Sequence, residues 1–510
     1  MIPWDECAYV YSDLVNANLI KSLGVISALP YLYFAHAPIT HVQDTVALLL
    51  FGNRPSAPYL FNVLYVFLYL HTINRALRKF GAAPVVAFSI MATSTPLLFL
   101  FSSHLKSDFL AGCFAFVMLV ELFLIDAETG RSSPYYNLAV PSLLGSCVVL
   151  CKPMAFYVPG LICFIFASHM LREAATGRLR DRWPGSVVPY LAAAALPVIV
   201  YASVALPDLE YFIATIKQAL SPPWVSHVGL LTRLDFYLPI VIARSPSLST
   251  FWGLGFSAFI LLGLAFAWAS FRKLISREDA ITILALAAIA AASFVPLVAS
   301  PQLQMPFGAI FCGAVIATFL ACYVSLKRTN GRYHLLDLAL IGVSLACFNL
   351  PVTQYEPVIP STPKDISQAA AIIHRFVSDI NSSNDPRPPS IYFSYSPIPY
   401  FDFGIQDYLV AHRFPGSLMM PVSVNNEEVS EDVRASDYVI LYIPDTPLKA
   451  SDNQYRVLMY TTADSILKSH QDLREIDRLP YADGNYVLYR VQATARPDAL
   501  TLSTPGDAVN

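Results

Sequence analysis

Charged residues are scarce in this chain. Asp, Glu, Lys and Arg make up 14% of its 510 residues, whereas soluble globular proteins carry about 25%. The shortfall is uneven, because charge is sparse before about residue 350 and ordinary afterwards. This composition excludes a soluble enzyme. The net charge of −3 gives no reason to expect a nucleic-acid partner.

Motifs for soluble cofactors are also missing. The sequence has no Gly-rich phosphate loop, no Walker-type lysine, no dinucleotide fingerprint and no zinc-protease helix motif. A transferase with a soluble nucleotide donor would need such a cradle, so that class is excluded. The cysteines fit no zinc or haem spacing and avoid the polar C-terminal third. We expect them to be small buried apolar residues: Cys7, Cys113, Cys147, Cys151, Cys163, Cys312, Cys322 and Cys347.

Long apolar segments are what the chain does contain. A membrane helix needs about 20 mostly apolar residues, and about ten segments approach that length. They are 56–74, 82–101, 108–125, 138–151, 154–171, 186–206, 250–271, 280–299, 304–326 and 335–350. The fold class expected from them is a polytopic α-helical membrane protein.

The basic residues in short loops predict the orientation of these segments. One set of alternate loops is rich in them: Arg75, Arg78, Lys79, Arg131, Arg172, Arg178, Arg180, Arg182, Arg272, Lys273, Arg277, Lys327, Arg328 and Arg332. The opposite set has fewer: Arg54, Lys106, Lys152, Lys217, Arg233 and Arg244. We expect the first set to be cytoplasmic. Residues 1–55, the turns near 102–107 and 151–153, loop 207–249 and everything after 350 then face outward.

The first outer loop has two unusual features. No apolar segment precedes residues 1–55 to carry them across the membrane, so we hypothesise that a first span lies upstream of Met1. Translation of the in-frame upstream codons tests this. Residues 8–23 and 40–51 mix apolar and polar side chains, as helices lying along a membrane surface do. We expect them to form a rim over a cavity.

The chain after residue 350 has the pattern of a soluble domain. Apolar residues at helical spacing predict a helix near 366–380. Runs rich in β-branched and aromatic residues predict strands at Ser390–Tyr395, Asp437–Ile443 and Asn485–Val491. We expect a small extracytoplasmic α/β domain over 351–493, after a membrane domain over 1–350. The polar tail, 494–510, is expected to be disordered.

Ionisable groups at membrane depth point to function, and three outward-facing places carry them. These are Asp5-Glu6, the run His104–Asp108 that contains Lys106, and Lys152. Each also has a structural interpretation, as a helix cap or as a lysine that reaches lipid phosphates. All three lie at outer ends of predicted spans, so one outer cavity could hold them together.

The order of these motifs resembles that of a known family. An Asp-Glu pair in a first outer loop, two surface helices, the element His36-Ala37-Pro38, a short second loop ending in Lys106-Ser107-Asp108 and a later Lys152-Pro153 follow one another. The chain is similar in this to membrane-embedded C-type glycosyltransferases that use polyprenyl-phosphate sugars. Protein O-mannosyltransferases, the aminoarabinose transferase of lipid A and galacturonosyl transferases of lipopolysaccharide are examples. Ala37 departs from the family pattern, because many relatives have a second proline there.

The resemblance implies an inverting transfer of a sugar from a polyprenyl-phosphate donor to a lipid, glycan or protein acceptor. It assigns Asp5, Glu6 and Asp108 to catalysis, with Asp5 as general base. It places the donor phosphate at Lys106 and Lys152. As a hypothesis beyond the resemblance, an arginine such as Arg233 or Arg244 could also stabilise that phosphate, and His36 and His104 are expected to bind substrate. Asp5 and Asp108 could instead hold a divalent metal ion. The expected location is a bacterial inner membrane, although the family also occurs in eukaryotic secretory membranes.

Two other functions remain open. A transporter or flippase of a lipid-linked substrate would place charges near the membrane midplane and show internal repeats, which we do not find. A sensor or assembly protein would bind a partner through its C-terminal domain. In the enzyme hypothesis that domain is a lid or an acceptor guide, and Asp402, Asp407 and His412 are solvated loop residues. His41 is expected to lie at the surface.

Overall fold

The computed structural model divides into two compact units, residues Ser12–Pro357, and Val358–Asn510 together with Met1–Tyr11. It describes the whole chain except a set of segments: 1–3, 30–31, 33–37, 53–56, 94–106, 126–133, 153–154, 178–186, most of 208–254, 300–307, 330–333, 349–362, 383–388, 395–416, 420–425, 446–453 and 493–510. The predicted tail therefore lies outside the described residues.

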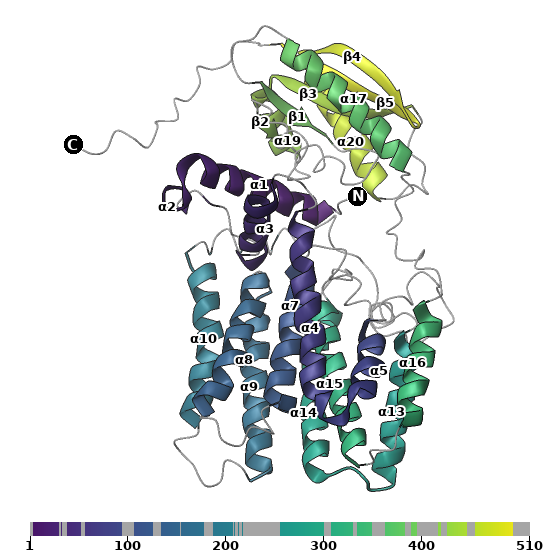
Figure 1. Cartoon of the computed structure of the whole chain (residues 1–510). Coiled ribbons are helices and arrows are strands. Elements are labelled where there is room, and N and C mark those ends of the chain that lie inside the picture. Colours follow the sequence, from purple (N-terminus) through teal and green to yellow (C-terminus); the bar gives the residue numbers. More distant parts are fainter. Residues whose placement is uncertain are drawn as a thin grey trace, which may run out of the picture. The chain divides into compact units, whose positions relative to one another are not determined.

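The first unit is a helical bundle (Figure 1). Its long helices are α4 (Asn62–Leu77), α5 (Ala82–Thr93), α7 (Ser107–Val120) with a π-helical turn, η4 (Glu121–Ile125), α8 (Pro134–Cys151), α9 (Val158–Ala175), α10 (Val187–Ala205), α13 (Gly255–Phe271), α14 (Arg277–Ala299), α15 (Ala309–Thr329) and α16 (His334–Phe348). A helix lies at each predicted span. Five helices in the described chain are long and apolar enough to cross a membrane: α7 with η4, α9, α10, α14 and α15. The number of ten spans stays a prediction.

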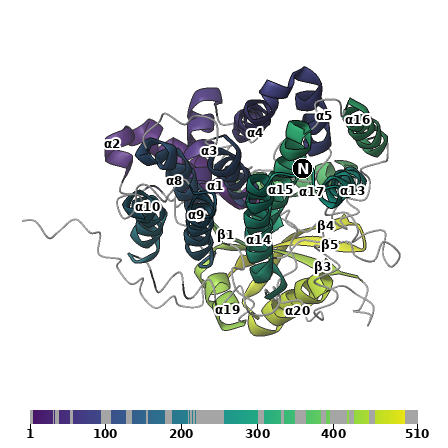
Figure 2. The same cartoon turned by 90° about the horizontal axis from the view of Figure 1, so that it is seen from below.

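Small residues let the two central helices of the bundle approach closely. A Cβ atom on Gly112 of α7 would lie 2.6 Å from the carbonyl oxygen of Ala309, and one on Gly313 of α15 would lie 2.5 Å from the carbonyl oxygen of Gly112. Without an aqueous solvent between them, membrane helices associate through such close packing. In the end-on view, α14 and α15 lie between α9 and α13 (Figure 2). The six described cysteines of the bundle are free thiols.

Ion pairs join the helices at the end that carries the basic loops. Arg75 of α4 pairs with Glu121 of η4, and Arg328 of α15 lies 2.7 Å from Asp279 of α14. The buried Lys327 lies 2.5 Å from Asp337 of α16. Buried charges are stable only when paired, so these contacts let the basic residues sit at the helix ends. Following the orientation predicted from them, we call this end inner and the opposite end outer.

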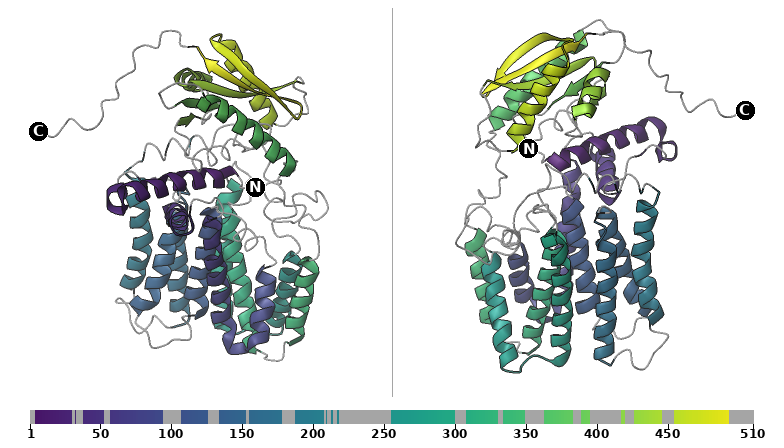
Figure 3. Two further views of the ribbon diagram at one scale, coloured as in Figure 1. Left: turned by 45° about the horizontal axis from the view of Figure 1, so that its top comes forward. Right: turned by 180° about the vertical axis from the view of Figure 1, so that it is seen from behind.

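Two helices that do not cross the bundle lie at its outer end. They are α1 (Trp4–Leu23), of which the part from Ser12 belongs to this unit, and α3 (Pro38–Phe51) (Figure 3). Gly24, at a φ of 79°, separates α1 from the short α2 (Val25–Ala28). The short η2 (Pro58–Phe61) leads into α4. Both helices lie where the mixed polar and apolar pattern predicts them.

The C-terminal unit is an α/β domain. Its elements are α17 (Pro363–Ser382), β1 (Ser390–Phe393), β2 (Ser417–Met419), α19 (Asn426–Ala435), β3 (Tyr438–Pro444), α20 (Gln454–Ser469), β4 (Leu473–Tyr481) and β5 (Gly484–Val491). The sheet order is β2-β1-β3-β5-β4, with β1 parallel to β2 and β3, and β5 antiparallel to β3 and β4. One apolar core joins α17 to one face of the sheet, and a second joins α19 and α20 to the other. The sequence predicts α17, β1, β3 and β5 but misses the other four elements.

Candidate functional site

Two of the predicted site residues meet at the outer end of the bundle. Lys152 follows the last residue of α8 and forms an ion pair with Asp108, which lies in the first turn of α7. Helix dipoles favour an acid at an N-terminus and a cation at a C-terminus, so each charge suits its own helix. The side chain of Asp108 is 14% exposed and that of Lys152 is 16% exposed. The pair is therefore mostly buried but still accessible to solvent.

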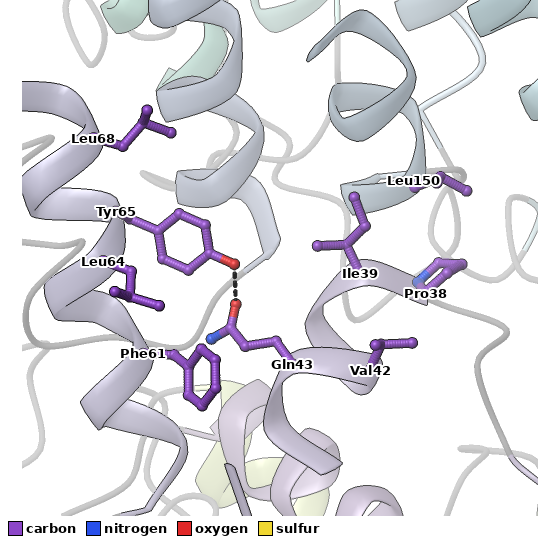
Figure 4. Close-up of a pocket in the computed structure, with 9 residues that line it drawn as sticks. All are labelled: Pro38, Ile39, Val42, Gln43, Phe61, Leu64, Tyr65, Leu68 and Leu150. Carbon is purple, nitrogen blue, oxygen red and sulfur yellow. Dashed lines mark hydrogen bonds between the residues drawn. The ribbon is translucent and has the colours of Figure 1, made fainter. Parts of the chain in front are cut away.

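An apolar groove of about 440 Å³ lies beside this end of α8 (Figure 4). It is lined by Pro38, Ile39, Val42, Gln43, Phe61, Leu64, Tyr65, Leu68 and Leu150. Its walls thus come from α3, η2, α4 and the last turn of α8. The hydroxyl of Tyr65 donates a hydrogen bond to Oε1 of Gln43 across the groove. Leu150 lies two residues before Lys152, so a charged group follows closely on one wall of the groove.

Behind the groove, α3 is joined to α1 by buried polar groups. Nδ1 of His41 lies 2.8 Å from Oδ1 of Asp13, and the hydroxyl of Thr45 donates to the same oxygen at 3.4 Å. His41 is 1% exposed and Asp13 is not exposed at all. The expectation of a surface histidine at position 41 is therefore wrong. The prediction fails because α1 covers this face of α3, and the residue that contacts His41 there, Asp13, is 28 residues away in the sequence.

The other predicted site residues cannot be placed by their side chains. Asp5 and Glu6 lie in the first turn of α1, but the described side chains of that helix begin at Asp13. Outside the described residues lie His36, His104, Lys106, Arg233 and Arg244, together with Asp402, Asp407 and His412 of the C-terminal unit. Of the predicted set, the structure brings together Asp108 and Lys152. The roles assigned to all of them stay predictions.

The described residues do not offer a metal site. Among them, no three His, Cys, Asp or Glu side chains lie close enough to hold an ion. The carboxylate of Asp108 is occupied by the ammonium of Lys152, which competes with any cation for it. The side chain of Asp5, the other residue of the predicted metal set, lies outside the described residues, so the metal stays a prediction and we derive no chemical step from it.

In the C-terminal unit, a serine lies close to a histidine and an aspartate that are about 40 residues later in the sequence. The hydroxyl of Ser430 lies 3.1 Å from Nε2 of His470, and Oδ1 of Asp472 lies 3.7 Å from Nδ1. The second distance is too long for a hydrogen bond. Ser430 is the fifth residue of α19, so its N–H belongs to the helix and cannot stabilise an oxyanion. We interpret the group as a link between α19 and α20.

Comparison with known proteins bears on the fold. No family model and no curated protein matches the sequence. The crystal structure of ArnT from Cupriavidus metallidurans bound to undecaprenyl phosphate matches with a TM-score of 0.55 at 13% identity, over 97% of this chain and 94% of that one. The same protein in the apo state gives 0.51 at 13% identity, over 96% and 93%. The Archaeoglobus fulgidus oligosaccharyltransferase, in complex with Zn and sulfate, gives 0.50 at 13% identity, over 94% and 76%.

These likenesses extend over both units of the chain. At 13% identity they concern the arrangement of the backbone and not the chemistry of individual side chains. They agree with the apolar helices in identifying a multi-pass integral membrane protein. The chain has the fold of the membrane-embedded C-type glycosyltransferases, as the order of its motifs predicts.

Proposed function

We propose that this protein is a glycosyltransferase that moves a sugar from a polyprenyl-phosphate donor to a lipid, glycan or protein acceptor at the outer face of the membrane. The observation that carries the proposal is the ion pair of Lys152 and Asp108 near an apolar groove, two residues beyond its lining residue Leu150. A polyprenyl phosphate has the same two parts, an apolar chain and an anionic head. No soluble nucleotide donor is needed, because the phosphate is already the leaving group.

The groove accepts the first isoprene units of the donor. Its wall is apolar apart from Gln43 and Tyr65, which bond to each other. Burial of apolar surface contributes about 25 cal/mol per Å², so a chain that leaves water or headgroups for this groove gains affinity. The chain then extends into the lipid along α4, whose side chains Val63 and Phe67 are exposed.

The phosphate of the donor binds at Lys152. In this arrangement Asp108 holds the lysine side chain in place. The anionic phosphate then shares the positive charge of the Lys152 ammonium with the carboxylate of Asp108. Lys106, Arg233 and Arg244, which stand in outer segments of the sequence, add to the positive charge around the leaving group. Fixed charges aimed at a developing anion are among the largest contributions to catalysis.

The chemistry is a single displacement at the anomeric carbon. The hydroxyl oxygen of the acceptor forms the new bond, and its proton passes to the carboxylate of Asp5. The bond between the anomeric carbon and the phosphate oxygen breaks, and its electron pair leaves with the polyprenyl phosphate. Attack from the face opposite the phosphate inverts the configuration. Glu6 supports Asp5, while His36 and His104 contact the sugar or the acceptor.

Transfer of radiolabelled sugar from synthetic polyprenyl phosphates tests the proposal. Purified Asp5→Asn protein should lose about 10²–10⁴-fold in turnover, the usual contribution of a general base. Asp464→Asn, at an exposed carboxylate of α20, is the matched control and should turn over normally. Wild-type turnover by Asp5→Asn would remove Asp5 from the mechanism. A mass profile of envelope glycans and lipid A from a deletion strain would then identify sugar and acceptor.

A further inference from the structure

Asp13 and His41 are completely buried ionisable residues on the two surface helices at the outer end. Neither is among the residues used above for the transfer reaction, and neither is exposed enough to touch a substrate. Burying ionisable groups is costly, so a pair of them calls for a reason. The groups sit immediately behind the groove wall that α3 provides.

One oxygen of Asp13 ties two successive turns of α3 to α1. Oδ1 lies 2.8 Å from Nδ1 of His41 and 3.4 Å from the hydroxyl of Thr45. His41 and Thr45 are four residues apart in α3, so they share one face of that helix. Two contacts one turn apart fix both the rotation and the axial position of α3 against α1.

The environment of the pair favours neutral groups over ions. Burial raises the pKa of Asp13 well above its usual 3.8, with the Thr45 hydrogen bond as a smaller opposing effect. Burial also lowers the pKa of His41 from 6.5 to about 4. Among the described residues Oδ2 of Asp13 has no hydrogen-bond donor, which a carboxylate anion would require. Burial and the missing donor both favour a proton on the carboxyl group and a neutral imidazole.

The neighbouring faces of α3 make the groove. Ile39, Val42 and Gln43 line it, and Gln43 accepts the hydrogen bond from Tyr65 of α4. Nε2 of Gln43 also donates to Oδ1 of Asp44 at 3.2 Å. The helix is thus held from behind through His41 and from the front through Gln43. If the rear contact is lost, the groove wall can rotate or slide.

We propose that Asp13 and His41 are positioning residues for the lipid donor: as a neutral hydrogen-bonded pair that shares one proton, they lock α3 onto α1 and so set the shape of the apolar groove. This inference rests on the proposed function only for the identity of the ligand. Its structural part, the neutral lock, is independent of any ligand.

Two pairs of variants in the full-length protein separate hydrogen bonding from charge. Asparagine at position 13 has the shape of a protonated aspartic acid, and the amide of asparagine at position 41 can either donate or accept a hydrogen bond near the place of Nδ1. We expect Asp13→Asn and His41→Asn to bind undecaprenyl phosphate within about twofold of the wild type. Asp13→Leu and His41→Leu should weaken binding by about tenfold or more, as the loss of buried hydrogen bonds does. Asp464→Asn is the control for an exposed carboxylate.

Hydrogen exchange of α3 gives a readout without ligand. The backbone amides of Pro38–Phe51 should exchange faster in the two leucine variants and at the wild-type rate in the two asparagine variants. If Asp13→Asn exchanges and binds as poorly as Asp13→Leu, the carboxylate charge is needed and the neutral lock is wrong. If all four variants exchange and bind like the wild type, the pair does not position α3.

The failure of the proposed function would look different. Wild-type protein would then not bind undecaprenyl phosphate at all, while the exchange rates of α3 would still differ between the leucine and asparagine variants. Should the leucine variants not fold, the asparagine variants alone decide the matter. Weak binding and fast exchange in Asp13→Asn overturn the lock, and wild-type behaviour in both asparagine variants supports it.

Discussion

Lys152 and Asp108 form an ion pair between the end of α8 and the start of α7. The contact joins residues that lie 44 apart in the sequence, and it is the point where two predicted site residues meet. Both side chains are mostly buried, so removing either one leaves an uncompensated charge. In our mechanism the same lysine also holds the donor phosphate. Lys152 therefore contributes to both stability and turnover, and variants of the pair can separate the two contributions.

The first prediction separates these two contributions. Lys152→Met should lower the melting temperature, because Asp108 loses its partner, and should lower turnover by about 10²–10³-fold, the effect of removing one charge-stabilising donor. The double variant Lys152→Met/Asp108→Asn should recover stability but not turnover. Lys468→Met, at an exposed lysine of α20, is the control. If the double variant recovers turnover as well, Lys152 has a structural role alone.

The second prediction concerns the crossing of α7 and α15. Gly112 lies one turn from Asp108, and a Cβ atom there would press on the backbone of Ala309. Gly112→Ala should therefore destabilise the protein by about 1–3 kcal/mol, as overpacking does, and should reduce turnover by displacing Asp108. Gly160→Ala in α9 is the matched control, since nothing lies within 4 Å of its Cβ position. Thermal unfolding in detergent compares the stabilities of the two variants, and the sugar-transfer assay compares their turnover. Equal melting temperatures for the two variants would mean that the helices can move apart freely.

The positions of the helices could be predicted from the sequence, because apolar length and loop charge are local properties. The contact of His41 with Asp13 could not. It depends on how α1 crosses α3, and nothing in either segment states that geometry. One signal was present: Asp13 interrupts an amphipathic stretch whose other polar residues are uncharged or near its end, and such a carboxyl group needs a partner.

In the C-terminal unit the sequence misses β4 for a physical reason. The strand lies at an edge of the sheet, and edge strands commonly carry charged side chains that discourage further pairing. Arg474, Glu475, Asp477 and Arg478 give it the composition of a loop. Three of them form ion pairs: Arg478 lies 2.7 Å from Glu475, and Asp477 lies 3.1 Å from Arg375 of α17. Central strands such as β3 lack these charges and were predicted.

The third prediction is that single variants of the buried pair have opposite pH dependence. In Asp13→Asn only His41 titrates, and its pKa is lowered from 6.5 to about 4 by burial. Below pH 6.5 His41 is protonated in the unfolded chain but stays neutral in the native protein. Stability therefore falls as the pH drops from 6.5. At about 1.4 kcal/mol per pH unit, the loss by pH 4 is at most about 3 kcal/mol.

In His41→Asn only Asp13 titrates, and burial raises its pKa above 3.8. The native protein keeps a proton that the unfolded chain releases, so stability rises as the pH drops. In the wild type the two opposite shifts offset each other, so the slope of stability against pH should lie between the slopes of the two variants. Melting temperatures across this range, in a buffer series of constant ionic strength, measure the three slopes. Parallel slopes in the two variants would contradict a shared proton.

The fourth prediction tests whether the groove holds the isoprenoid chain. Ile39 lines the groove, and Ile39→Trp fills part of its volume of about 440 Å³. A tryptophan there should weaken binding of undecaprenyl phosphate by about tenfold, the loss expected when about 55 Å² of apolar contact is excluded at 25 cal/mol per Å². Binding of a short-chain lipid phosphate such as farnesyl phosphate, which leaves part of the groove empty, should weaken less.

Val46→Trp is the matched control for this change. Val46 belongs to the same helix and is 37% exposed, but it does not line the groove, so binding of both lipids should stay as in the wild type. The diagnostic quantity is the ratio of the two affinities, because a general distortion of α3 would weaken both lipids equally. An Ile39→Trp variant that keeps the wild-type preference for the long chain would place the isoprenoid elsewhere, and Lys152 would then no longer mark the phosphate end of the donor.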